Sequence, residues 1–397
     1  YYIAASPPFR SRACWLTLCA MEPSMTDEEE KEYGAILIDT SIFDGNGLRL
    51  EKGLLGKLSQ FKQSPIVFLF PDVIKNEVLR HLESKIKISR AALEKALNDA
   101  GDHLFFEGSE LNDAKQTLVG SKEIEGLADS RVNNFIEATG ALVLDCGDYV
   151  SVSDLLAGYF SNNPPFAETG KKKSEFPDAI VLMAVETWAD QNNLDVLAIA
   201  KDGDWESYCT KSKRIDYIED LSKGLAVFNR TNGPYALLVN LERALHENNA
   251  EHFLSEVGAG LESALNGITP DQEADSHLYW EPEGCHAWFK EFELLENEFR
   301  IVDKDDDWIV LEAMAKITVE AEGEFSLSVY DSIDRDHVYM GGITATAIEE
   351  FESEILITIS GDLNGPIDGL TVDDVEVVST IGSINFGTIE PDYGEDY

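Results

Sequence analysis

The hydrophobic pattern of this 397-residue chain changes in kind near residue 270. Before that point, short apolar runs such as 35–38 and 66–70 alternate with stretches whose apolar residues recur every three to four positions. This alternation is typical of a parallel sheet whose strands are joined by helices. After it, apolar and polar residues alternate with a period of two, which predicts antiparallel strands. The pattern therefore predicts an α/β fold with a Rossmann-like parallel sheet flanked by helices, followed by a helical connector and an antiparallel β domain.

The element boundaries follow from the same pattern and from its proline, glycine and capping residues. Strands are predicted at 35–38, 66–70, 141–144, 194–200 and 214–218, with helices at 72–82, 85–97, 124–136, 151–160 and 178–191 and from 204. Later strands are predicted at 309–321, 324–330, 343–348, 355–359 and 375–381. The expected parts are a disordered leader or extension at 1–33, an α/β domain at 34–232, a helical connector at 233–269, and an acidic β domain with a disordered tail at 270–397.

Charge divides the chain in a similar place. The whole chain has 75 acidic and 31 basic residues, a net charge of -44. Residues 1–240 hold 37 acidic and 25 basic side chains, whereas 241–397 hold 38 and 6. A chain so negative cannot coat nucleic acid as a basic protein does, because that affinity comes from neutralising phosphates. We therefore expect the β domain to contact a protein partner or another copy of itself.

Cysteine usage and hydropathy indicate the compartment. The five cysteines are widely spaced and form no C-x-x-C pair, so a disulfide framework or a structural zinc site is not expected. No apolar stretch reaches the roughly 20 residues of a membrane span. The prediction is a cytoplasmic protein without a membrane segment.

Acidic residues follow the predicted strands of the α/β part. Asp39 comes directly after the first strand, and Asp202 and Asp204 follow the strand that ends at Ala200. Glu77 and Asp178 lie near the starts of two helices. Groups just past the carboxyl ends of parallel strands share one edge of the sheet, where ligands bind. These acids are therefore expected to converge on one site.

The chemistry of such a cluster is restricted. Neighbouring carboxylates repel one another, and a divalent cation relieves that repulsion. Oxygen ligands without His or Cys favour Mg²⁺ or Mn²⁺ over zinc. One or two such ions can generate a hydroxide and stabilise charge on a phosphate.

Four segments together resemble a known family. They read Ile-Leu-Ile-Asp-Thr-Ser at 36–41, Pro-Asp-Val-Ile-Lys-Asn-Glu-Val at 71–78, Phe-Pro-Asp-Ala-Ile at 176–180 and Ile-Ala-Lys-Asp-Gly-Asp-Trp at 199–205. In this order and setting they resemble the PIN-like nuclease domains, over roughly 35–228 and hence within the predicted 34–232 domain. The resemblance implies a metal-dependent ribonuclease with a Rossmann-like core.

The resemblance also implies roles for individual residues. Asp39, Glu77, Asp178 and Asp202 would be the catalytic acids and ligands of one or two Mg²⁺ or Mn²⁺ ions, with Asp204 an additional ligand. One departure is Ala200, where family members commonly have Ser or Thr. The implied activity is endonucleolytic hydrolysis of RNA phosphodiester bonds, and a toxin or anti-phage effector role is compatible with it.

Other interpretations stay open. Each acid taken alone is more often a turn residue or a helix cap. The domain could instead act on DNA, as flap-type nucleases do, or be a catalytically silent protein-binding scaffold.

Several residues outside the acids have two interpretations each. Three basic groups, near 75–90, 171–173 and 211–214, are predicted to flank the acids and guide phosphates, or else to be ordinary solvated surface. Trp205 could stack on a base, although core packing is the better prediction. Trp280, Trp288 and Trp308 are predicted to pack in the core of the β domain.

Overall fold

A computed structural model describes residues 31–104, 109–119, 123–166, 175–229, 235–295, 298–305, 307–331, 335–363 and 367–391. All but the first two of these residues belong to a single compact unit, which spans Tyr33–Tyr397. Nearly all of the predicted leader and the end of the acidic tail lie outside the described residues, so those two predictions stay predictions.

The N-terminal part contains a five-stranded parallel sheet, as the apolar runs predict. Its strands are β1 (Ala35–Ile38), β2 (Val67–Pro71), β3 (Leu142–Leu144), β4 (Val196–Ile199) and β5 (Ile215–Ile218). They lie in the order β3-β2-β1-β4-β5, with every neighbouring pair parallel. All four residues of β1 and of β4 are buried, which explains why these strands are continuous apolar runs.

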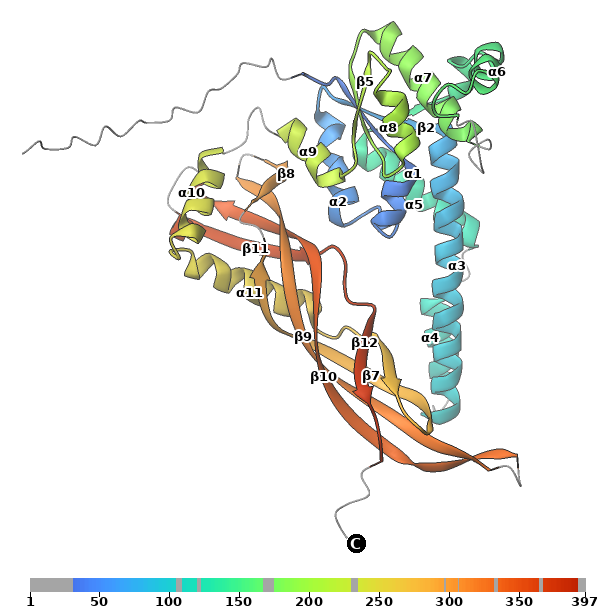
Figure 1. The fold of residues 1–397 in the computed structure, drawn as a ribbon, viewed down its shortest axis with the longest axis vertical. Coiled ribbons are helices and arrows are strands. Elements are labelled where there is room, and N and C mark those ends of the chain that lie inside the picture. The colour runs from blue at the N-terminus through green and yellow to red at the C-terminus, as the bar shows by residue number, and fades with distance from the viewer. Residues whose placement is uncertain are drawn as a thin grey trace, which may run out of the picture. The chain divides into compact units, whose positions relative to one another are not determined.

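Helices join these strands and pack around the sheet (Figure 1). They are α1 (Thr40–Gly45), α2 (Gly53–Gly56), α3 (Asp72–His103), α4 (Glu110–Leu118), α5 (Ile124–Thr139), α6 (Val152–Phe160), α7 (Phe176–Asn192), α8 (Gly203–Cys209) and α9 (Leu221–Asn229). The two helices predicted at 72–82 and 85–97 form one helix, α3, because no proline or glycine interrupts the chain between them. Beyond the sheet, α4 lies along α3, and Lys115 Nζ donates a hydrogen bond to Asn98 Oδ1.

The strand order sets the position of a ligand site. From β1 the chain first adds β2 and β3 on one side of the sheet, and it then crosses back to add β4 and β5 on the other side of β1. In open parallel sheets, ligands bind at the carboxyl ends of the strands where this direction reverses. That point lies between the carboxyl ends of β1 and β4, directly before Asp39 and Asp202.

The C-terminal part contains the predicted antiparallel sheet, of order β11-β10-β9-β7, with β8 also paired to β9, and a small pair of β6 and β12. The strands are β6 (Asp271–Asp275), β7 (Tyr279–Leu294), β8 (Arg300–Lys304), β9 (Trp308–Asp331), β10 (Asp336–Gly361), β11 (Leu370–Val377) and β12 (Ser383–Thr388).

Two pairs of predicted strands are fused, which corrects the sequence interpretation. The predicted strands 309–321 and 324–330 are one strand, β9, and 343–348 and 355–359 are one strand, β10. Gly323 is a packing position and not a turn, because a Cβ there would lie 2.6 Å from the ring of Phe386. The paired residues of β9 and β10 run from Trp308 opposite Ser360 to Asp331 opposite Asp336.

The connector forms two helices, α10 (Tyr235–His246) and α11 (Glu251–Leu265). One side of α11 is buried against the antiparallel sheet, as the spacing of its apolar residues predicts. The three tryptophans differ in position: Trp280 packs partly against this core, Trp288 is 43% exposed, and Trp308 packs against the core of the parallel sheet. The prediction is therefore wrong for the last two.

The two sheets share buried contacts. Val302, Val310 and Leu356 of the antiparallel sheet belong to the same buried cluster as the residues of the parallel sheet. Polar contacts lie at the same junction: Gln60 Nε2 donates to the Val302 carbonyl at 2.9 Å, and the Gly53 amide donates to Glu376 Oε2 at 2.9 Å. The β region therefore completes part of the core of the α/β region.

Candidate active site

Asp39 lies at the carboxyl end of β1 and caps helix α1. Its Oδ2 accepts hydrogen bonds from the backbone amide of Ser41 at 3.0 Å and from the Ser41 hydroxyl at 2.5 Å. The Ser41 oxygen accepts in turn from the backbone amide of Lys201, at 3.1 Å, just after β4. This chain of bonds ties the ends of two neighbouring strands together and fixes the orientation of a buried carboxylate.

Glu77 reaches the same edge from the early part of α3. Its Oε2 accepts a hydrogen bond from the hydroxyl of Thr40, the residue after Asp39, at 2.9 Å. Because Pro71 ends β2 and α3 begins at Asp72, the first turns of this helix are held beside the carboxyl ends of the strands. A contact across 37 residues of sequence thus joins the second acid to the residue that follows the first.

Asp178 lies in the first turn of α7 and is held by an aromatic side chain. The indole Nε1 of Trp205 donates to Asp178 Oδ1 at 3.1 Å. Trp205 is only 1% exposed and packs in the core of the parallel sheet. Phe176, two residues before Asp178, packs against Tyr159 of α6 with ring centroids 5.1 Å apart. Both contacts fix the start of α7.

Asp202 follows β4 and caps α8. Its Oδ1 accepts from the backbone amide of Asp204 at 2.8 Å. Asp204 is itself buried in the first turn of that helix and is linked to the site through this amide. Asp39 and Asp202 are therefore helix caps, the ordinary interpretation of such residues, and the capping bonds also fix their carboxylates at the sheet edge.

The electrostatics connect the four acids. The pKa of Asp178 is raised to about 6, mainly by burial and further by the charges of Asp39, Asp202 and Glu77, while the Trp205 bond opposes the rise. Burial also raises the pKa of Asp39, against the hydrogen bonds from Ser41, and the charge of Glu77 adds to the rise. The four acids thus lie close enough for their charges to act on one another.

Comparison with known proteins identifies this region. Residues 36–205 match the family model of the PIN domain. This part of the chain is a PIN domain. The match begins in β1 and ends at Trp205, so it includes all four acids. The comparisons with curated proteins and with solved structures found no match.

PIN domains are generally nucleases that use divalent metals. The side chains of this site are of the chemical type that binds a divalent metal ion. The four side chains offer only carboxylate oxygens, the ligands that Mg²⁺ and Mn²⁺ prefer. Burial raises the pKa of Asp178 most, and the charges of the other three acids add to the rise; a cation would offset this excess of negative charge. Among the described residues, however, no three His, Cys, Asp or Glu side chains are already gathered as a metal-binding group. Each carboxylate instead accepts a bond from a neighbouring hydroxyl, indole or amide.

The structure places the basic groups that are predicted to flank the acids differently from one another. Arg214 lies at the opposite edge of the sheet, where it bonds to Asp190 at 2.8 Å and Asp195 at 3.3 Å, so the prediction that it flanks the acids is wrong. The lysines at 171–173 lie outside the described residues. Lys75 lies in the first turns of α3, two residues before Glu77.

Sequence reasoning missed three supporting residues of the PIN site. Thr40 and Ser41 donate hydroxyl hydrogen bonds to two of the acids, and the indole of Trp205 donates to a third. The first two had a signal, since hydroxyl residues directly follow the first acid. The prediction that Trp205 packs in the core is confirmed, and its indole N–H bonds to an acid as well.

Proposed function

We propose that this protein is a metal-dependent endoribonuclease that hydrolyses RNA phosphodiester bonds. The observation that supports it best is the placement of Asp39 and Asp202 at the switch point of a PIN sheet, where the charges of Asp39, Asp202 and Glu77 act on Asp178. Asp39, Glu77, Asp178 and Asp202 would hold one or two Mg²⁺ or Mn²⁺ ions, with Asp204 an additional ligand. When bound, such a cation activates water and offsets charge on the phosphate.

The chain's own contribution is the placement of these oxygens. Ser41 and Thr40 orient the carboxylates of Asp39 and Glu77, and Trp205 orients that of Asp178. Hydrogen bonds to the ionised form of a carboxylate also favour that form, which is the one that binds a cation.

The decisive experiment is cleavage of matched RNA and DNA oligonucleotides with Mg²⁺, with Mn²⁺ and with EDTA. Wild type is expected to cut internal RNA bonds only with metal, and Asp39→Asn is expected to reduce the rate at least a thousandfold. Asp129→Asn changes the same charge at an exposed site on α5 and should leave the rate unchanged.

Other results of this experiment would replace the proposal. Cleavage of DNA in preference to RNA would indicate a flap-type activity. No cleavage of either substrate at any metal concentration would indicate a protein-binding scaffold. Full activity of Asp39→Asn would exclude the proposed site.

The cellular setting is part of the proposal. The three described cysteines, Cys146, Cys209 and Cys285, are buried free thiols, which suits the reducing cytoplasm. None of the helices in the described ranges is long and apolar enough to cross a membrane. A toxin or anti-phage effector role would show as growth arrest on expression of wild type and normal growth with Asp39→Asn. The acidic β region would bind a protein partner or a second copy.

A further inference from the structure

The long antiparallel sheet has one face that its own helices and short strands cover. Along β9, residues Ile309, Leu311, Ala313, Ala315, Ile317, Val319, Ala321, Phe325 and Leu327 are buried on this inner face. Helix α11 packs there, and Phe386 of β12 contacts Phe325 with ring centroids 5.2 Å apart. Because side chains alternate along a strand, the intervening residues of β9 form the outer face.

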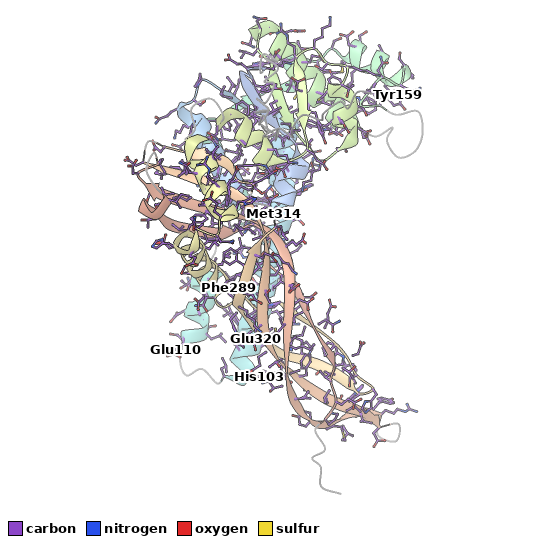
Figure 2. The ribbon with its side chains drawn as sticks, turned by 60° about the vertical axis from the view of Figure 1, so that its left-hand side comes forward. His103, Glu110, Tyr159, Phe289, Met314 and Glu320 are labelled. Carbon is purple, nitrogen blue, oxygen red and sulfur yellow. The ribbon has the colours of Figure 1, made fainter. Side chains whose placement is uncertain are left out.

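Midway along the strands, the outer face presents two large apolar side chains to solvent. Trp288 of β7 and Ile348 of β10 both lie opposite Glu320 of β9, so the three residues form one row across the strands. Trp288 is 43% exposed and Ile348 is 56% exposed. Figure 2 marks the position of Glu320 on the sheet. An exposed tryptophan and an exposed isoleucine on either side of Glu320 are side chains that could anchor a protein interface.

The surroundings of this row are strongly negative. The strand pairing places these acids on the outer face: Glu281, Glu291, Glu293, Glu320, Glu322, Glu324, Glu350 and Glu352. Two lysines offset part of this charge, since Lys316 contacts Glu350 at 2.5 Å and Lys290 contacts Glu320 at 3.7 Å. The remaining carboxylates leave the face with a clear excess of negative charge.

We propose that this outer face binds a protein partner whose surface carries apolar side chains surrounded by lysine and arginine. This inference does not depend on the nuclease site. Of the two binding partners proposed above for the acidic β region, a protein partner or a second copy, it selects the protein partner. Trp288 and Ile348 would be the buried anchors, and the carboxylates would form a rim that attracts a basic surface and rejects an acidic one. Nucleic acid would bring phosphates against carboxylates, and a second copy would bring two acidic faces together. Charge complementarity therefore favours a basic protein.

The test uses the full chain and fluorescein-labelled peptides of defined composition. One peptide alternates lysine with leucine, and a second alternates lysine with serine at the same net charge. Binding is measured by fluorescence anisotropy at low and high salt. The leucine peptide is expected to bind at least tenfold more tightly than the serine peptide, and Trp288→Ala is expected to remove that difference. Ile88→Ala removes a 64% exposed apolar side chain from α3 and should change nothing.

Each remaining outcome decides against the proposal. Equal binding of both peptides, or no binding, would show that the apolar row does not act as an anchor. Sedimentation that shows a dimer of wild type but a monomer of Trp288→Ala would assign the face to a second copy. Loss of RNA binding in Trp288→Ala would assign it to nucleic acid. Ile348→Ala repeats the test at the neighbouring anchor, and thermal unfolding verifies that both variants are folded.

Discussion

Replacing Asp178 by Asn should stabilise the metal-free protein while abolishing cleavage. The carboxylate of Asp178 is partly buried among three other acids, and its pKa is raised from 3.8 to about 6. Asn keeps an oxygen that can accept the Trp205 indole bond but carries no charge. The substitution therefore removes a partly buried charge, together with its repulsion by the other acids, and keeps a side chain of similar size at the start of α7.

The magnitude follows from the size of the pKa shift. A rise of about two units corresponds to about 3 kcal/mol of lost stability once the group is ionised. Because the side chain is not fully buried and solvent screens its charge, we expect a gain of about 1 to 2 kcal/mol in the free energy of unfolding. The folded pKa lies above the unfolded one, so the penalty is absent below pH 4, grows as the pH rises, and is complete above about pH 6. The gain should thus be largest at pH 7.5 and clearly smaller at pH 5.

The assay is urea unfolding with EDTA at both pH values, with Asp129→Asn as the control for a change of net charge. Added Mn²⁺ should reverse the order of stability, since wild type would gain binding energy that the variant has lost. A destabilised variant at pH 7.5, or a gain that does not depend on pH, would refute the reasoning that the ionised carboxylate of Asp178 costs stability.

Three further changes test neighbouring contacts. Trp205→Phe removes the indole that donates to Asp178 and should lower the cleavage rate at least tenfold. The control is Trp188→Phe, at a similarly buried position, which should lower stability with little loss of cleavage rate. Thr40→Val removes the hydroxyl bonded to Glu77 and should lower the initial rate of cleavage about tenfold. Thr40→Ser keeps the hydroxyl, so recovery of the rate in this variant would show that the hydrogen bond matters and not the packing of the methyl group. The pKa of Glu354 is raised to about 7, mainly by burial, so Glu354→Gln should stabilise the fold by about 1 kcal/mol at pH 8 and much less at pH 5 in urea unfolding.

The parallel sheet and the acids at its edge were accessible from sequence because their signals are local. Asp39 and Asp202 each follow a fully buried strand, and strand ends in a parallel sheet must share an edge. The third acid had a local signal too, since Pro177 opens its helix. These acids could be found without knowing any contact between them.

The features that sequence reasoning missed depend on contacts distant in the chain. The Trp205 bond joins residues 27 positions apart, and only the fold brings the indole to that carboxylate. Gly323 looks like a turn locally, but its space is used by Phe386, which arrives 63 residues later. Trp308 has the spacing of a β-core residue, yet it packs against the other sheet. Periodicity gives the face of a strand but not which neighbour covers it.

The shared buried cluster has a consequence for synthesis on the ribosome. The α/β region ends with α9 at Asn229, but its cluster also needs Val302, Val310 and Leu356, the last of them about 130 residues later. At about 5 to 20 residues per second, that gap lasts roughly 6 to 25 s. During that time the nascent α/β region would have part of its core exposed, until most of the β sheet is made. A chain terminated inside that sheet should therefore be loosely packed and sensitive to proteases, and the α/β region should not fold fully without it.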